Sequence, residues 1–236
     1  VSTRAERVGD EYVIDGAKTF ISNGQNADLI LVVAKTDPRA EPAHRGISLL
    51  LVPASAPGFV RGRKLDKLGL RGQDTSELFF ESCRIPARNL LGQEGQGFKY
   101  LMTQLQQERL TIAIGSIASC RRALDDTLSY VKERRAFGQP IGSFQNTQFK
   151  LAELATQVEI GQTFVDQLCL RHAQREELVM EASMAKYWTT DLLCEVTDTG
   201  VQLHGGYGYT TEYEIGKAWV DARIGRIYAG TNEIMK

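Results

Sequence analysis

The hydrophobic repeat of the chain changes after Pro86, and this change limits the possible folds more than any other feature. Before it, short apolar runs such as residues 28–36 and 46–52 are bounded by Asn, Asp, Pro and Gly, which is typical of buried strands. After it, apolar residues recur in steps of three and four, the repeat of an amphipathic helix. We therefore predict an α+β multidomain chain: a small β-barrel or sandwich over residues 1–92, then an antiparallel four-helix-type bundle over residues 93–236.

In the first domain, the segment from Glu11 to Gly16 predicts a strand that runs into a turn, and Ala17 to Ser22 predicts the returning strand. In the second domain, a first helix is predicted from Phe98 to Arg134. The next two helices carry apolar or small residues in helical register: Leu151, Leu154, Val158, Gly161, Val165 and Leu168 in one, and Ala182, Ala185, Thr189, Leu192, Val196 and Leu203 in the other. Thr210 and Thr211 predict the N-cap of a helix of about 14 residues that ends near Gly225.

Charge and cysteine content exclude several classes of function. The chain has 28 Lys and Arg against 29 Asp and Glu, a net charge of −1, so composition argues against a nucleic-acid or anionic membrane partner. No apolar run is long enough to span a bilayer, and no signal peptide is visible, so we do not expect a secreted protein. The four cysteines form no CxxC pair, which predicts reduced, buried thiols, and the three histidines are too scattered for a zinc site.

Glu108 stands in register with the apolar stripe of the first helix. The step from Leu105 to Ile112 passes through position 108 in the same rhythm of three and four, so its carboxylate is predicted to point into the bundle. Burying an unpaired carboxylate is costly. Two interpretations stay open on the pattern alone: a structural ion pair with a neighbour such as Arg109, which the pattern slightly favours, or a general base held in an apolar pocket.

Three further segments could bind a ligand. Arg134 and Arg135 end the first helix, where they either complement the helix dipole or bind a phosphate through their guanidinium groups. The glycines of GGYGY at 205–209 allow a flat ligand to approach the backbone, and the turn at 228–233 leads into a helix start suited to an anionic or carbonyl oxygen. Phe20 and Ser22, two residues apart at a strand end, share one face, although an ordinary hairpin exit explains them equally well.

Four motifs, in this order and spacing, resemble the acyl-CoA dehydrogenase family: RRAFGQPIGSFQ, SMAKYW, VQLHGGYGY and RIYAGTNEIMK. The likeness covers essentially the whole chain, and QQERL with GTNEIMK is most similar to the long-chain and isovaleryl branch. It implies the family's middle β-domain followed by its C-terminal helical domain, without the N-terminal domain. Because the chain begins in strand-like sequence and stops in a helix start, we expect both of its domains to be truncated.

The resemblance implies FAD as the cofactor and assigns residues to it. Phe20 would lie on the flavin ring and Ser22 near its N5 edge, Arg134 would bind the FAD of a neighbouring subunit, and Arg109 would lie near the acyl-CoA. The complete set implied for FAD is Phe20, Ile21, Ser22, Arg134, Phe137, Gln145, Gln202, Leu203, His204, Gly205, Gly206, Thr231 and Glu233, and for the substrate Arg109 and Gly230.

One departure from the family pattern bears on the mechanism. Many members carry their catalytic glutamate between the Tyr and Gly of the YxGT turn, where this chain has Ala229, whereas the long-chain and isovaleryl branches place it at the position of Glu108. The resemblance thus implies Glu108 as the base, the Ala229 N–H as an oxyanion donor, and trans-2-enoyl-CoA as the product. It also implies a homotetramer, electron-transfer flavoprotein as the acceptor, and a location in a bacterial cytoplasm or the mitochondrial matrix. A non-catalytic scaffold of the same fold and an acyl-CoA oxidase are the alternatives.

Overall fold

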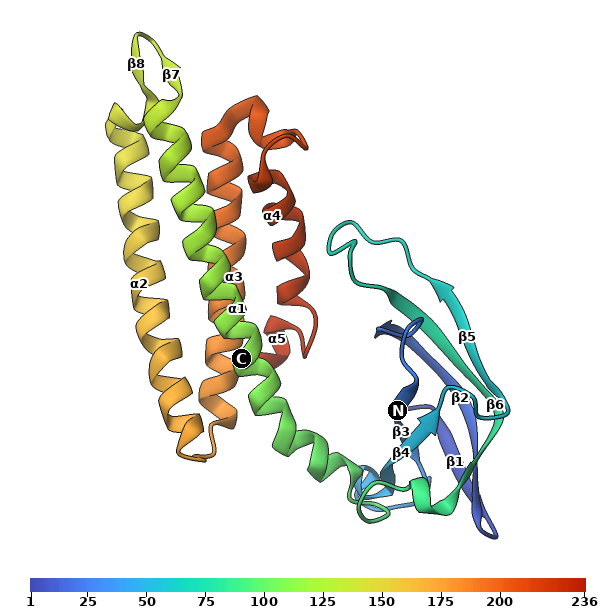
Figure 1. The fold of residues 1–236 in the computed structure, drawn as a ribbon. Helices are drawn as coiled ribbons and strands as arrows, with labels where there is room; N and C mark the ends of the chain where they lie inside the picture. Colours follow the sequence, from blue (N-terminus) through green and yellow to red (C-terminus); the bar gives the residue numbers. More distant parts are fainter. The chain divides into compact units, whose positions relative to one another are not determined.

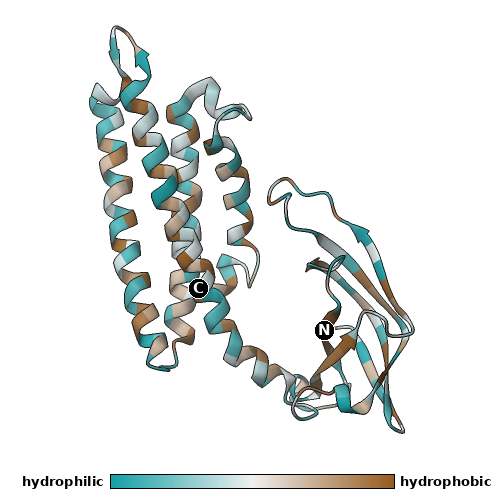
Figure 2. Ribbon diagram, in the orientation of Figure 1, coloured by the Kyte–Doolittle hydropathy of each residue, from teal (hydrophilic) through white to brown (hydrophobic).

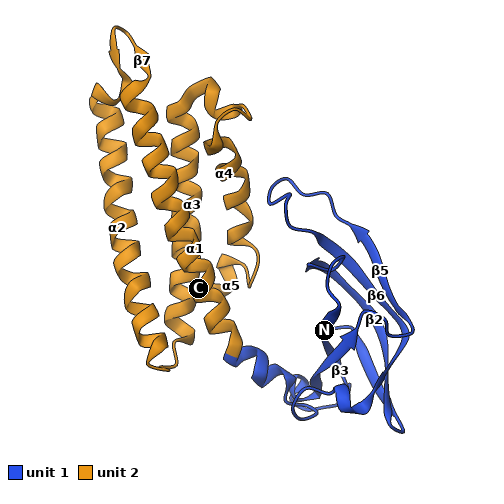
Figure 3. Cartoon of the chain, viewed as in Figure 1, with its two compact units in different colours: residues 1–103 blue, residues 104–236 orange.

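The computed structural model describes residues 1–236 and divides into two compact units, residues 1–103 and 104–236 (Figures 1 and 3). The first contains a six-stranded sheet and the second a bundle of helices, so the predicted α+β class is confirmed. None of the helices combines the length and the apolar character that a membrane span requires. All four cysteines are free thiols; two of them, Cys83 and Cys120, are buried and the other two are half-buried.

Unit 1 is a single six-stranded sheet (Figure 1). Its order is β4-β3-β1-β2-β6-β5, and every pairing is antiparallel except that of β1 with β3. The edge strands β4 and β5 do not pair with each other, so the sheet is open and the barrel, one of the two forms predicted for this domain, does not close. The strands are β1 (Arg4–Val8), β2 (Glu11–Ser22), β3 (Leu29–Lys35), β4 (Ile47–Pro53), β5 (Phe59–Lys64) and β6 (Thr75–Pro86).

The predicted hairpin at Asp15–Gly16 is wrong, because β2 continues through this point as one strand. The register of β2 against β6 shifts between Ile14 and Gly16, which marks a bulge. A Cβ at Gly16 would lie 2.8 Å from the Cα of Thr3, so the glycine is needed for close packing of the two backbones rather than for a turn. The hairpin that does form joins β1 to β2 at Gly9, whose φ is +63°.

Unit 2 is built on long helices linked by short segments. Successive long helices run antiparallel, and a small hairpin of β7 (Arg135–Ala136) and β8 (Gln139–Pro140) connects the first two (Figure 1). The helices are α1 (Gly97–Glu133, with residues 104–133 in unit 2), α2 (Gln145–Ala173), α3 (Val179–His204), α4 (Glu214–Ala222) and α5 (Asn232–Met235). Helix α4 is shorter than predicted: it begins at Glu214, and the Thr210 hydroxyl donates instead to the Tyr207 carbonyl.

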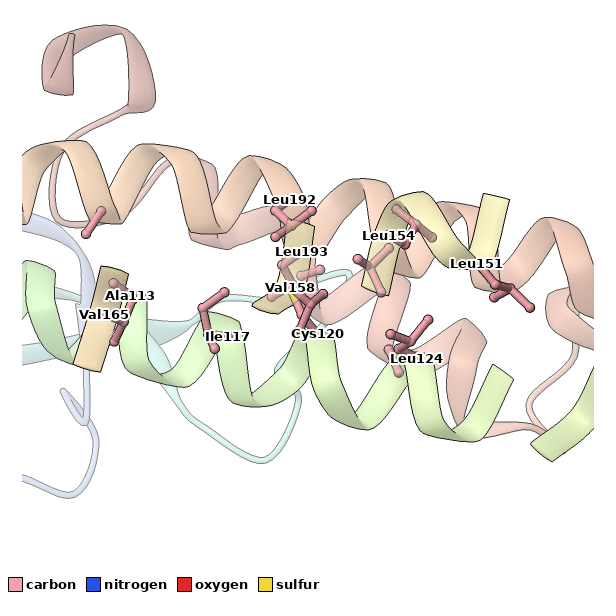
Figure 4. Packing of buried hydrophobic residues seen from close by; sticks show 14 of the residues in the cluster. Ala113, Ile117, Cys120, Leu124, Leu151, Leu154, Val158, Val165, Leu192 and Leu193 are labelled. Atoms are coloured by element: carbon pink, nitrogen blue, oxygen red, sulfur yellow. The ribbon is translucent and has the colours of Figure 1, made fainter. Parts of the chain in front are cut away.

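The core of unit 2 lies where α1, α2 and α3 face one another. Figure 4 shows side chains from the three helices converging, with Ile117 from α1, Val158 from α2 and Leu192 from α3 among them. Both hydrophobic and polar residues recur along the whole length of these helices, as expected of amphipathic helices (Figure 2). All six positions predicted on α2 are buried, and burial of each large aliphatic side chain contributes about 1.5–3 kcal/mol to stability.

Candidate active site

A strained turn lies between the short helix η5 (Arg223–Arg226) and α5. Ala229 has φ of 53° and Gly230 has φ of 97°, so two successive residues adopt left-handed backbone conformations. For a residue with a Cβ this costs roughly 1–3 kcal/mol, and such a conformation persists only where surrounding contacts enforce it. Contacts with neighbouring residues must therefore hold this turn in place.

A buried network fixes this turn from α3. Lys186 has no exposed surface (0 %), and its Nζ donates to the Gly230 carbonyl at 2.7 Å and to Asn232 Oδ1 at 2.9 Å. Asn232 is itself buried, and its Nδ2 donates to the Tyr187 carbonyl at 3.1 Å and to Asp191 Oδ1 at 3.0 Å. Buried networks in which each member is satisfied rigidify the segment they join.

The backbone N–H of Ala229 has no hydrogen-bond partner within the chain. The preceding N–H, of Tyr228, donates to the Ile224 carbonyl at 3.2 Å, and the Gly230 carbonyl that follows is bound by Lys186. An unpaired N–H held between fixed neighbours is an available donor for an external carbonyl or anionic oxygen.

Arg109 lies beside the same turn. A Cβ placed on Gly230 would be 4.0 Å from its Nη2, and its Nη1 donates to Ser183 Oγ at 3.1 Å. Its Nε is buried without a partner. Burial first, and then the Arg109 cation, lower the pKa of Lys186 below its ordinary value. The turn thus has two cations behind and beside it, one of which has an unused donor.

The expectation that Glu108 points into the bundle is wrong. Glu108 is exposed, and the buried face of α1 follows Leu110, Ala113 and Ile117 instead. No ion pair joins Glu108 to Arg109, so the structural-pair interpretation also finds no support. The carboxylate stands on the surface of unit 2, where it is accessible to a ligand.

The loop after α1 combines an exposed cation with an exposed ring. The Arg134 guanidinium lies 5.5 Å from the centre of the Tyr207 ring, a cation–π distance. Phe137 is 95 % exposed at φ of 51°, and its ring lies edge-to-face with that of Phe144, with 6.2 Å between the ring centres. A strained backbone that presents an aromatic ring to solvent is typical of a binding surface. Gln145, the first residue of α2, is exposed.

The residues at the end of α3 divide into exposed and packed positions. Gln202, Gly205 and Gly206 are exposed, and a Cβ at Gly206 would meet nothing within 4 Å, so neither packing nor conformation requires a glycine there. Leu203 instead packs against the core, and His204 is buried. The His204 ring stacks on Tyr130 at 4.0 Å, and burial lowers its pKa. Of the predicted cofactor contacts here, the side chains of Leu203 and His204 belong to the interior of the unit.

The predicted contacts at the end of β2 sit on a second irregularity of that strand. The register against β6 shifts again between Lys18 and Ile21, and Phe20 has φ of 61° with 76 % of its surface exposed. Ser22 is exposed as well, whereas Ile21 packs against the core of unit 1. The ring and the hydroxyl are therefore both available on the surface of unit 1.

The last two predicted cofactor residues are at α5. Thr231 is half-buried and Glu233 is exposed. The Glu233 carboxylate accepts hydrogen bonds from its own backbone N–H and from the Thr231 hydroxyl, which lower its pKa. Both residues are thus tied to the same segment as Ala229.

Family models match both units: residues 1–83 match the acyl-CoA dehydrogenase middle domain, and residues 95–236 match the acyl-CoA dehydrogenase C-terminal domain. The chain belongs to the acyl-CoA dehydrogenase family. Both domain types are those that the sequence motifs predicted, so the resemblance is confirmed.

Similar proteins include members of the predicted branches. The mitochondrial long-chain specific acyl-CoA dehydrogenase of Mus musculus is 49% identical over 236 residues, which cover 100% of this chain and 55% of that protein. The mitochondrial isovaleryl-CoA dehydrogenase of Pongo abelii is 38% identical over 99% of this chain and 55% of its own length. This chain therefore spans about half the length of the curated relatives it matches.

Solved acyl-CoA dehydrogenases share the fold. The crystal structure of one from Geobacillus kaustophilus matches with a TM-score of 0.98 and 53% identity over 100% of this chain and 62% of that one. A glutaryl-CoA dehydrogenase from Mycobacterium smegmatis, described as in complex with FADH2, matches with a TM-score of 0.92 and 30% identity over 100% of this chain and 59% of that one.

Lys186 and Asn232 were not predicted as site residues, although both lie within the motifs that carry the resemblance. One signal was present for Lys186: it follows the buried Ala182 by four residues, which places it on the buried face of α3. For Asn232 only the fold, which brings α5 against α3, gives the partners.

Proposed function

We propose that the protein is an FAD-dependent acyl-CoA dehydrogenase that converts an acyl-CoA to the trans-2-enoyl-CoA. The observation that carries this proposal is the unpartnered N–H of Ala229 on a turn fixed by a buried network, in a chain that belongs to this family. Such a donor is suited to the carbonyl oxygen of a thioester, whose negative charge grows as the α-proton leaves.

Two groups of unit 2 would handle the substrate. The Glu108 carboxylate would accept the α-proton, which requires an accessible base within hydrogen-bond reach of that carbon. The Ala229 N–H would donate to the thioester oxygen and stabilise the enolate-like charge, with the Arg109 cation nearby. FAD, when bound, supplies a hydride acceptor for the β-carbon, so that loss of the proton and the hydride leaves the new double bond.

The residues proposed for FAD fit a flat, charged ligand. In unit 1 these are Phe20, Ile21 and Ser22, where the exposed ring of Phe20 is held on a strained backbone. In unit 2, Arg134 supplies a cation and Phe137 an exposed ring. The remaining proposed contacts are Gln145, Gln202, Gly205, Gly206, Thr231 and Glu233, together with the backbone of Leu203 and His204.

The proposed partners follow from the same assignment. We propose a homotetramer in which Arg134 and Phe137 reach the FAD of a neighbouring subunit, which accounts for their exposure in the single chain. Electron-transfer flavoprotein is the proposed acceptor.

A panel of acyl-CoA substrates, from branched short-chain to long-chain, tests this function on the protein purified with its flavin. We expect bleaching of the oxidised flavin by at least one substrate, formation of the trans-2-enoyl-CoA, and reoxidation by electron-transfer flavoprotein. A non-catalytic scaffold, which Ala229 in place of the more common glutamate would favour, predicts no bleaching with any substrate. Oxygen uptake at the turnover rate would identify an oxidase instead.

A further inference from the structure

Lys186 is a fully buried cation whose acceptors are both neutral. Its Nζ contacts a backbone carbonyl, at Gly230, and an amide oxygen, at Asn232, and no carboxylate pairs with it directly. Moving an ammonium group out of water is costly, and an apolar side chain of similar volume would avoid that cost. The stability of the fold alone therefore does not favour a lysine at this position.

The contacts of Lys186 hold the residue that follows the unpaired donor. Ala229 and Gly230 form the left-handed pair, and the Gly230 carbonyl closes this pair on its C-terminal side. On the N-terminal side the hydrogen bond from Tyr228 to the Ile224 carbonyl holds the chain. With both ends held, the direction of the Ala229 N–H is determined by the backbone between them.

We propose that Lys186 is a positioning residue, whose ammonium clamps the Gly230 carbonyl so that the Ala229 N–H is aimed at the carbonyl oxygen of the bound acyl-CoA. This inference rests on the proposed dehydrogenase function. A misaimed donor weakens contacts made in the transition state more than it weakens binding of the ground state, because the charge on the oxygen is greatest in the transition state. The positive charges of Lys186 and Arg109 also stabilise negative charge on a ligand atom at the turn.

The test compares Lys186→Met with the parent in single-turnover flavin reduction by the best acyl-CoA of the panel. We expect the rate constant to fall about 10- to 100-fold, less than the full loss of one oxyanion donor, with the Kd for acyl-CoA nearly unchanged. Lys186→Gln keeps an N–H donor group but loses the charge, so its rate constant should lie between those of Lys186→Met and the parent. Thr197→Val on the same helix is the matched control: it removes a buried hydroxyl that bonds only within α3, and its rate should equal that of the parent.

A second readout separates positioning from a general loss of structure. A 3-oxoacyl-CoA ionises to an enolate, and its absorbance with oxidised flavin reports the ionised fraction of the bound ligand. In Lys186→Met the pH of half-ionisation should rise by about one unit, a tenfold loss of preference for the enolate. Thr197→Val should not change it.

Each outcome decides the proposal. Rates and half-ionisation pH equal to those of the parent in a folded Lys186→Met protein would overturn it and leave the proposed function intact. Equal losses in Lys186→Met and Thr197→Val, or failure of both Lys186 variants to fold, would assign Lys186 to the fold alone. A parent protein that no acyl-CoA reduces would overturn the dehydrogenase function and this inference with it.

Discussion

Two parts of the candidate site in unit 2 are built in opposite ways. The turn at Ala229 and Gly230 is held by hydrogen bonds from the buried Lys186, which binds the Gly230 carbonyl and the buried Asn232. Glu108 and the loop at 134–138 are exposed, and no ion pair holds the Glu108 carboxylate. The difference matches the two tasks: an oxyanion donor acts only if its direction is fixed beforehand, whereas groups that meet a ligand at a surface can be ordered as it binds.

This comparison separates stability from activity. Substitutions in the buried network that holds the turn at Ala229 and Gly230 should lower the free energy of unfolding, because they leave buried polar groups without partners. Substitutions at the exposed groups should change reaction rates or cofactor affinity while the fold is kept, because surface changes away from special features stay within about 0.5 kcal/mol.

The largest effect is expected at Glu108. Glu108→Gln keeps the shape but removes the proton acceptor, so flavin reduction should slow by roughly 10²- to 10⁴-fold while acyl-CoA still binds. Stopped-flow absorbance at saturating substrate measures the rate, and the adjacent exposed Gln107→Ala is the control with the parent rate. Reduction of Glu108→Gln at the parent rate would show that the carboxylate has no catalytic role.

The next effect is expected at Asn232, on stability. Asn232→Ala leaves Lys186 Nζ with one acceptor fewer and removes the donors to Tyr187 and Asp191, so the free energy of unfolding should fall by about 3 kcal/mol. Urea unfolding of this variant beside Glu108→Gln measures the contrast directly. Equal stability of the two variants would show that the buried turn and the exposed Glu108 do not differ in their contribution to folding.

A smaller effect is expected at Arg134, on the cofactor. Arg134→Ala removes an exposed cation that contacts the Tyr207 ring and, in the proposed assembly, an FAD of the neighbouring subunit. The Kd for FAD should rise on the order of tenfold without loss of helicity. Flavin retention on dialysis, read beside circular dichroism, measures both; full retention of the flavin would argue against this loop as a cofactor contact.

The smallest effect is expected at Glu233 and depends on pH. Its pKa is lowered in the folded state, so its contribution to stability is present above about pH 4.5, the ordinary glutamate value, and is lost as the pH falls through the folded-state value. Glu233→Gln should therefore unfold at a temperature that differs from the parent's near neutral pH and converges with it in acid. A constant difference across this range would show that the hydrogen bonds from Thr231 and the backbone do not act on this carboxylate.

The parts of the fold that can be predicted are those in which the hydrophobic pattern alone determines the buried face. The stripe of α2 was predicted position by position, since apolar residues mark all of its positions except that of Gly161. On α1 the same rhythm placed Glu108 inside, because the predicted stripe was extended from Phe98 and Leu101, which belong to unit 1. The buried face in unit 2 has the same steps of three and four but starts from Leu110, so it lies on another side of the helix. Small buried residues such as Ala113 and Cys120 mark the real face only weakly.

The rest depends on contacts between distant segments. Gly16 resembles a turn glycine in the sequence, and only the register shift of β2 against β6 and the close packing of Thr3 show a bulge instead. The motifs indicated the turn at Ala229, but its strain and its unpaired N–H appear only in the structure. The spacing of Lys186 from Ala182 indicates burial, but lysines are mostly exposed, and the role of this one depends on the segment 44 residues later that it binds.

Exchange of the substrate α-proton tests the role of Glu108 most directly. With the flavin reduced beforehand, the β-hydride has no acceptor, so exchange of the α-hydrogen for deuterium from D2O reports proton removal alone. We expect the parent to catalyse this exchange, as followed by NMR of the acyl-CoA, and Glu108→Gln to lose it while Gln107→Ala keeps it. Exchange by Glu108→Gln at the rate of the parent would show that Glu108 is not the base and that another residue removes the proton.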